Sequence, residues 1–347
     1  MTGSMDPLTQ TLLGAVAGQA LCGRRLGPAA ALLGAVGGAI PDIDVFFPTA
    51  EAALPVAYHR HFTHSLLFVP AGGAAAALPF LLLGRWRRHW KLLITAAVAG
   101  CATHGLLDTF TSYGTHLLWP FSSHRLSWDL ISIIDPVFTL VLAVGLVWSL
   151  LLTKAKTARP ARIALLVNLV YLGAGFVQHQ RAAAGQADLA RRRGHLIERA
   201  RVMPTLSNLL VWRSIYEAKG VLYADAIRVP TFGAPALRPG SSLPVVGLAD
   251  LGPRAAGNSR IHRVFAGFWG FADGYVARLP GQERVIADMR YSLTPEGFDA
   301  LWGVRITTDG PVPAAEWVYL ATDRRGALTE LWRDVRNPSR FRPLGNE

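Results

Sequence analysis

The sequence predicts a mainly α-helical membrane protein, a polytopic helix bundle with a small β-rich C-terminal domain. The 347-residue chain is 51% apolar and only 17% charged, whereas soluble domains carry about 25% charged residues. Six long stretches with no charge, or with one ionisable residue, follow one another in the first half. Beyond residue 180, charge becomes frequent and short alternating segments replace the apolar stretches. The composition excludes a disordered chain, a coiled coil and a disulfide-stapled secreted scaffold.

The apolar runs predict the membrane helices in order, at residues 7–23, 26–41, 65–84, 92–107, 130–152 and 163–178. A spanning helix needs about 20 apolar residues, with a range near 17–25, so 65–84 and 130–152 are long enough by themselves. We expect the shorter, Gly- and Ala-rich runs to tilt, to span partly or to pack against neighbours. Small residues such as those of 34–38 permit close helix contact in a bilayer. A soluble, all-apolar helical core is the alternative, but six successive runs favour a membrane.

Clusters of arginine and lysine predict the orientation of the bundle. The first cluster is Arg24 and Arg25, the second lies within 85–91 and the third within 154–162. Two apolar runs separate each cluster from the next, so all three can face the cytoplasm together. The loops at 48–64 and 109–129 then lie at the outer face of a bacterial-type inner membrane.

We expect two domains, a transmembrane helical domain at 5–180 and a water-facing, β-rich domain at 202–347. Between them, residues 180–201 have the pattern of an amphipathic helix. Apolar residues alternate along 284–293 and predict a strand. Weaker strand predictions fall at 221–229, 261–269 and 316–321.

Side chains that bind metal ions lie at the ends of the runs, on the predicted outer face. Asp42 and Asp44 close the second run, and histidines 59, 61 and 64 open the third. His104 and Asp108 close the fourth run, and a helix places residues four apart on one face. The predicted orientation rests on Lys and Arg alone. The location of all these metal-binding side chains on one face is therefore independent of it.

Together these residues predict a metal centre. Carboxylate and imidazole ligands suit zinc first, and also manganese or iron. Each motif alone is typical of a helix surface or a turn, but ionisable residues at membrane depth are costly and usually functional. We expect one small polar cavity with Gln10 at its edge. The predicted ligands of its divalent ion are Asp42, Asp44, His59, His64, His104 and Asp108.

With these motifs on one chain, the sequence resembles the YdjM-like family of membrane-bound hydrolases. The matching stretches are MDPLTQTLLG at 5–14, PDID at 41–44, HRHFTHS at 59–65, HGLLD at 104–108, and SYG to LWPF within 112–121. The resemblance implies a bundle of membrane helices, a hydrolase that depends on a divalent metal, and a distant likeness to zinc-dependent phospholipase C. Two positions depart from the family pattern. Gln10 stands where the family commonly has histidine, and His61 where it usually has glycine.

The function we expect is hydrolysis of an ester or phosphoester, including that of a lipid, at the outer membrane face. Asp44 would accept the proton of the attacking water and Arg60 would bind a phosphate oxygen. The expected partners are the lipid bilayer and a small-molecule or lipid substrate. Nucleic acid is not expected, because inner-face loops account for much of the positive charge. The alternatives are a non-enzymatic metal-binding or transport protein and a catalytically silent scaffold.

Overall fold

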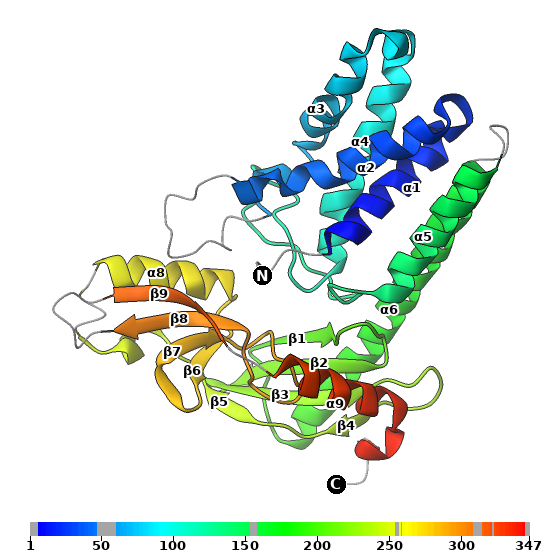
Figure 1. Cartoon of the computed structure of the whole chain (residues 1–347). Coiled ribbons are helices and arrows are strands. Elements are labelled where there is room, and N and C mark those ends of the chain that lie inside the picture. The colour runs from blue at the N-terminus through cyan, green and yellow to red at the C-terminus, as the bar shows by residue number, and fades with distance from the viewer. Residues whose placement is uncertain are drawn as a thin grey trace. The chain divides into compact units, whose positions relative to one another are not determined.

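The computed structural model describes residues 6–46, 60–152, 158–253, 257, 259–307, 314–320 and 323–343. The chain forms two compact units, Met1–Pro48 with Tyr58–Val177, and Thr49–Ala57 with Gln178–Glu347. We call them the helical unit and the C-terminal unit; the second contains two β-sheets (Figure 1). The predicted class is therefore confirmed in its coarse form, a mainly helical chain with a C-terminal β-sheet region.

The predicted apolar runs lie in the helices of the helical unit. These are α1 (Pro7–Leu26), α2 (Pro28–Ala39), α3 (Val69–Leu82), α4 (Trp90–Phe110), α5 (Pro136–Leu151) and the first part of α6 (Ala158–Arg192). Proline stands in the first turn of α1, α2, α3 and α5, where its fixed φ and missing N–H cost nothing. Among the described residues, three helical segments are long and apolar enough to cross a membrane, namely Pro28–Phe46, Trp86–Phe110 and Ala158–Arg192.

The two runs expected to span outright contain shorter helices. In the run at 65–84, α3 begins only at Val69 and has 14 residues, and in the run at 130–152, α5 begins at Pro136 and has 16. At about 1.5 Å per residue, they are roughly 21 and 24 Å long, against about 30 Å of hydrocarbon. The start of α5 is fixed by Asp135, whose carboxylate accepts hydrogen bonds from the backbone N–H groups of Val137 and Phe138.

Glycines let α2 lie directly against α1 and α4. A Cβ atom on Gly34 would lie 2.1 Å from the carbonyl oxygen of Gly14 on α1. One on Gly37 would lie 2.1 Å from the carbonyl oxygen of Ala97 on α4. Any larger side chain would push the helices apart, so the close contact expected for 34–38 is confirmed. This packing brings the last turns of α2 and α4 next to the first turn of α1.

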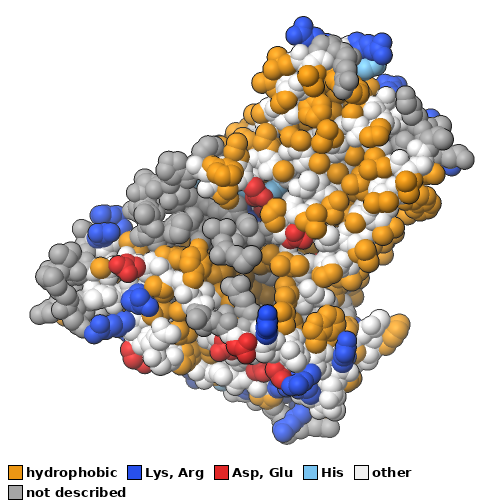
Figure 2. Space-filling view, viewed as in Figure 1, with side chains coloured by type: hydrophobic (Ala, Val, Ile, Leu, Met, Phe, Trp, Pro, Cys, Tyr) orange, Lys and Arg blue, Asp and Glu red, His pale blue; other side chains and the backbone are white. Residues whose placement is uncertain are grey.

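Charged groups separate along the helical unit. Its basic end carries Arg24 and Arg25 at the end of α1, Arg87, Arg88 and Lys91 around the start of α4, and Arg159 and Arg162 at the start of α6. Arg162 Nε donates to the carbonyl oxygen of Ala20 at 3.0 Å, which ties α6 to α1 there. Hydrophobic side chains cover most of the visible face, with Lys and Arg at the upper end (Figure 2). At the opposite end lie Asp42, Asp44, His64, His104 and Asp108, which the sequence analysis singled out.

The C-terminal unit is built on two antiparallel sheets. The first has the order β1 (Arg199–Pro204), β2 (Val211–Ala218), β3 (Val221–Arg228), β4 (Ala236–Arg238), β10 (Arg342–Pro343), and β5 (Ser242–Pro244) also pairs with β3. The second has the order β6 (Val276–Leu279), β7 (Gln282–Asp288), β8 (Trp302–Thr307), β9 (Ala314–Tyr319). Residues of both sheets share one apolar core that includes Met203, Ile215, Val285 and Met289. That this unit faces water, with limits at 202–347, stays a prediction.

Three of the four strand predictions are confirmed and one is wrong. Strand β3 covers 221–228 of the predicted 221–229, β9 covers 316–319 of the predicted 316–321, and β7 covers the first part of 284–293. Residues 261–269 form helix α8 (Ser259–Phe271) instead of a strand. Buried Ile261, Val264, Phe265 and Phe268 recur there at helical spacing.

Helix α6 also departs from the prediction, because the last apolar run and residues 180–192 form one continuous helix of 35 residues. The rest of the predicted amphipathic helix is wrong, since residues 193–198 are not helical and Arg199–Arg201 belong to β1. No proline interrupts it after Pro160, and the chain leaves it only at Arg192, before β1. Helix α9 (Arg324–Arg336) has no counterpart in the sequence prediction.

Candidate metal centre

Three side chains from distant parts of the sequence converge at the end of the helical unit opposite its basic end. Asp42 lies in the short helix η1 (Ile40–Phe46) after α2, His64 in η2 (Phe62–His64), and His104 in the last turns of α4. One ligand atom from each lies within 4.8 Å of the others. His64 Nε2 and His104 Nε2 are 3.1 Å apart. Asp42 Oδ1 lies 3.5 Å from the first and 3.4 Å from the second.

Asp108 adds a second carboxylate to this cluster, one helical turn after His104. Its Oδ2 atom lies 3.4 Å from His64 Nε2 and 3.8 Å from His104 Nε2. Its other oxygen, Oδ1, accepts a hydrogen bond of 2.8 Å from the side-chain amide of Gln10. Gln10 therefore lies at the edge of the cluster, where the sequence led us to expect it. We call Asp42, His64, His104 and Asp108 the four-residue cluster.

The hydrogen bonds of the two imidazoles turn both Nε2 atoms into the cluster. His104 Nδ1 lies 2.6 Å from the carbonyl oxygen of Gly38. A carbonyl only accepts, so this nitrogen carries the hydrogen and a neutral ring presents its Nε2 lone pair to the cluster. His64 Nδ1 faces the hydroxyl of Thr63 at 3.0 Å and Asp44 Oδ2 at 3.5 Å. Burial lowers the pKa of His64 to about 4, so its ring is neutral at pH 7.

These contacts satisfy the geometric requirements of a metal site. Two imidazole lone pairs 3.1 Å apart repel unless a proton or a cation lies between them. Ligands bonded at about 2.0–2.2 Å to one ion lie roughly 3–4.5 Å from each other, and the distances within the cluster fall in that range. Asp108 is fully buried, and its Oδ2 atom has no hydrogen-bond partner among the described residues. Two nitrogen and two carboxylate ligands suit zinc, and also manganese or iron.

Negative charge exceeds positive charge around the cluster. Three carboxylates, those of Asp42, Asp44 and Asp108, lie within 4 Å of its imidazoles. The one arginine recorded in contact with them in the described part of the chain is Arg60, whose Nε lies 3.5 Å from Asp108 Oδ2. A buried carboxylate such as that of Asp108 is costly unless enough positive charge lies nearby, so a divalent cation would improve the charge balance of this site.

Arg60 is held by its backbone as well as by its side chain. Its φ angle is 66°, in the left-handed region that non-glycine residues seldom occupy. The Arg60 N–H donates to Asp44 Oδ2, and the Arg60 carbonyl accepts from the N–H of His116 and the hydroxyl of Thr115. The guanidinium is buried and lies 4.4 Å from the ring centre of Tyr113. Unfavourable backbone geometry that is fixed by its surroundings is common at functional sites.

Gly105 permits the approach of η2 to α4. A Cβ atom at this position would lie 2.3 Å from the carbonyl oxygen of His64. Any other residue would therefore displace His64 from His104. The sequence motif HGLLD contains this glycine, but only the packed structure gives the reason for it.

The other two predicted ligands are Asp44, which lies outside the four-residue cluster, and His59. Asp44 is on the other side of the His64 ring, where its Oδ2 accepts from the Arg60 N–H and from the hydroxyl of Thr63. His59 lies outside the described residues. His61 packs 5.0 Å from His116 and 5.6 Å from Trp119, between ring centres, and is not one of the three residues that converge. Metal binding by the predicted ligands stays a prediction, and the geometry favours four of the five that the structure describes.

Comparison with known proteins points to a family. Residues 5–182 match the family model described as YdjM inner membrane protein. A Bacillus subtilis (strain 168) protein described as uncharacterized protein YfhP is 31% identical over 116 residues, which are 32% of this chain and 34% of that protein. The chain thus covers about a third of the length of this relative. No solved structure gives a significant match.

The cluster predicts that each chain binds one divalent ion. Replacing either imidazole, in His64→Ala or His104→Ala, should reduce the metal content of the purified protein to below about a tenth of an equivalent, because each variant loses one of the two nitrogen ligands of the four-residue cluster. Metal content is measured by mass spectrometry after gel filtration in detergent. His124→Ala, which removes an exposed histidine of the same end, should retain full content. Equal metal content in all four proteins would contradict the site.

Proposed function

This chain belongs to the YdjM inner membrane protein family, and we propose that it is a multi-pass, metal-dependent hydrolase of that membrane. The observation that carries the proposal is the pair of Nε2 atoms, 3.1 Å apart, of His64 and His104, with the carboxylates of Asp42 and Asp108 beside them. Two imidazoles and two carboxylates at the end of a helix bundle are a ligand set that hydrolytic metal enzymes use.

The four-residue cluster would hold the ion. A bound divalent cation would supply an activated water and polarise the bond to be cleaved. Asp42 is the member of the cluster with access to solvent, because its side chain is 23% exposed and the other three are almost fully buried. We therefore assign to Asp42, rather than to Asp44, the acceptance of the proton from the attacking water.

The residues around the cluster would orient the ligands. The Gly38 carbonyl fixes the ring of His104, and Asp44 with Thr63 fixes that of His64. Such second partners typically change metal affinity by 10–100-fold. Gln10 and Arg60 hold the two oxygens of Asp108. Asp44 is thus a positioning residue in this proposal.

Arg60 favours an anionic substrate. Its Nη1 atom is buried and has no hydrogen-bond partner in the part of the chain that the structure describes. A guanidinium beside a metal centre binds a phosphate oxygen strongly and a neutral ester oxygen weakly. We therefore favour a phosphoester over a carboxylic ester, either a small molecule or a lipid.

A non-catalytic metal-binding protein is the second candidate. Gln10 favours it, because this residue stands where the resemblance to the family leads one to expect histidine, and its amide N–H group donates to Asp108 instead of binding an ion. Without a histidine at position 10, the site has one metal ligand fewer than the family pattern. Such a site can still bind an ion without catalysing hydrolysis.

Hydrolysis by the full chain in nanodiscs decides between the two candidates. We expect cleavage of an aryl phosphodiester when stripped protein is reloaded with zinc or manganese, and a loss of at least about 100-fold in Asp42→Asn. Asp44→Asn should weaken metal binding about 10–100-fold and regain activity in excess metal. Arg60→Lys should slow phosphodiester cleavage more than aryl carboxylic ester cleavage. Protein that binds one ion and cleaves neither ester would support the non-catalytic candidate.

The proposal also predicts the orientation in the membrane. With Cys22 and Cys101 replaced by alanine, a cysteine at exposed Ser123, on the side of the metal centre, should react with an impermeant maleimide in spheroplasts. A cysteine at exposed Arg88, at the basic end, should react only after permeabilisation, because basic loops face the cytoplasm. Reaction of both positions in intact spheroplasts would contradict the assignment of the site to the outer face.

A further inference from the structure

Helix α9 is held in the C-terminal unit by one of its faces. Leu331 is buried in an apolar cluster with Val211, Ala226 and Phe341. Asp334 is also buried, and its Oδ2 atom lies 2.6 Å from the guanidinium of Arg238. Packing and this ion pair fix the rotation of the helix about its axis, and thereby fix which residues point outward.

The outward face combines large apolar side chains with arginines. Leu328 and Trp332, one turn apart, are 41% and 51% exposed. Leu206 of the β1–β2 connection lies beside them and lines a small hollow that both share. Arg325, Arg333 and Arg336 are exposed on the same face. We call Arg325, Leu328, Trp332, Arg333 and Arg336 the α9 face.

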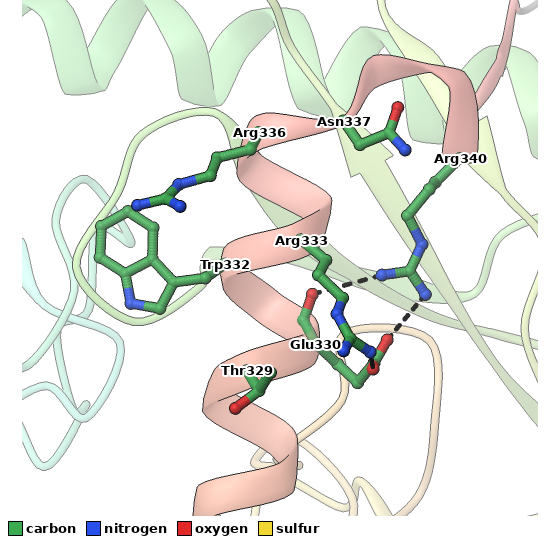
Figure 3. Close-up of a pocket in the computed structure, with 7 residues that line it drawn as sticks. All are labelled: Thr329, Glu330, Trp332, Arg333, Arg336, Asn337 and Arg340. Atoms are coloured by element: carbon green, nitrogen blue, oxygen red, sulfur yellow. Dashed lines mark hydrogen bonds and ion pairs between the residues drawn. The ribbon is translucent and has the colours of Figure 1, made fainter.

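A shallow hollow of about 640 Å³ lies along this face, lined by Thr329, Glu330, Trp332, Arg333, Arg336, Asn337 and Arg340 (Figure 3). The guanidinium of Arg336 lies 5.5 Å from the ring centre of Trp332. Arg333 and Arg340 both pair with the carboxylate of Glu330.

The hollow therefore has more positive than negative charge. Arg333 and Arg340 share the carboxylate of Glu330, and Arg340 also pairs with buried Asp334 at 2.9 Å. Within the described residues neither Arg325 nor Arg336 forms an ion pair. The face thus offers cationic donors next to exposed apolar surface, and a partner that fits it must be anionic and must also accept apolar side chains.

We propose that the α9 face docks on an anionic phospholipid surface. Amphipathic helices that lie on membranes combine Trp and Leu with Arg or Lys in this way, the apolar side chains entering the headgroup region and the guanidinium groups binding phosphates. Tryptophan also prefers this boundary, because its ring is apolar and its N–H is polar. The chain is an inner membrane protein, so a phospholipid surface is always available to it.

The composition of the face favours lipid over nucleic acid. A nucleic acid would use the arginines and stack on Trp332, but it would leave Leu328 and Leu206 in water. A bilayer surface uses both kinds of side chain. The inference is independent of the metal centre, because it rests on residues of the C-terminal unit alone. Docking would give this unit a second attachment to membrane besides the chain itself.

The test uses the full chain, with Cys22 and Cys101 replaced by alanine, in nanodiscs. A nitroxide is attached to Thr329→Cys, on the outward side of α9, and its collisions with oxygen are compared with those with a water-soluble nickel chelate. In nanodiscs containing phosphatidylglycerol, the oxygen-to-nickel ratio should rise several-fold over that in pure phosphatidylcholine. A nitroxide at Glu283→Cys, exposed on β7, is the control and should give one ratio in both.

Substitutions of arginine then test whether the positive charge of the α9 face causes the docking. Each arginine near an anionic surface contributes a factor of about five. The double variant Arg325→Gln/Arg336→Gln should therefore lower the ratio of docked to free unit about 25-fold, whereas Arg284→Gln on β7 should leave it unchanged. Equal ratios in both lipid mixtures, or no effect of the double variant, would overturn the proposal. Shielding of the nitroxide by an added oligonucleotide but not by phosphatidylglycerol would also overturn it, in favour of nucleic acid.

Discussion

The contact of two imidazole Nε2 atoms at 3.1 Å, with buried carboxylates around them, is the constraint on which the helical unit depends. Such an arrangement is unfavourable unless a proton or a cation lies between the rings, because lone pairs and negative charges face one another in a region of low dielectric constant. Contacts from the surrounding structure nevertheless hold both imidazole rings in this arrangement. The Gly38 carbonyl and Asp44 fix the two rings, and Gly105 removes the side chain that would separate them. So many contacts directed at one unfavourable cluster are best explained by an ion that makes it favourable.

The bilayer imposes the second constraint. Helices of the unit run between a basic end and an end that carries the carboxylates and histidines, and the faces between these ends are largely apolar. Glycines at 34 and 37 replace side-chain packing with direct backbone contact, the usual solution where hydrophobic burial cannot drive helices together. The same close packing sets the position of the four-residue cluster. The ends of α2 and α4 meet because backbone contacts at Gly34 and Gly37 hold α2 against its neighbours. Fold and site therefore depend on the same small residues.

The sequence predicted the parts of this structure that local pattern determines. Apolar runs located the helices, and carboxylates and histidines at the ends of those runs located the cluster. What could not be predicted depends on tertiary placement. The carbonyl of Gly38, the left-handed backbone of Arg60 and the position of Asp44 behind His64 exist only once distant segments meet. Helix α8 has a composition typical of a strand, because it is short and rich in aromatic and β-branched residues. The helical spacing of its apolar residues becomes evident only when their burial is known. Helix α9 was missed because most of its residues are polar and only one face packs.

The direct test of the central claim is the coordination of the metal that copurifies with the chain. X-ray absorption at the edge of that metal reports the number and type of its ligands. The account predicts one ion bound by two imidazole nitrogens and by carboxylate oxygens, at about 2.0–2.2 Å for zinc, and predicts that His104→Ala loses the bound metal and with it the imidazole signal. An ion surrounded by oxygen alone, or an imidazole signal that is unchanged in His104→Ala, would contradict the metal centre and the proposed activity with it.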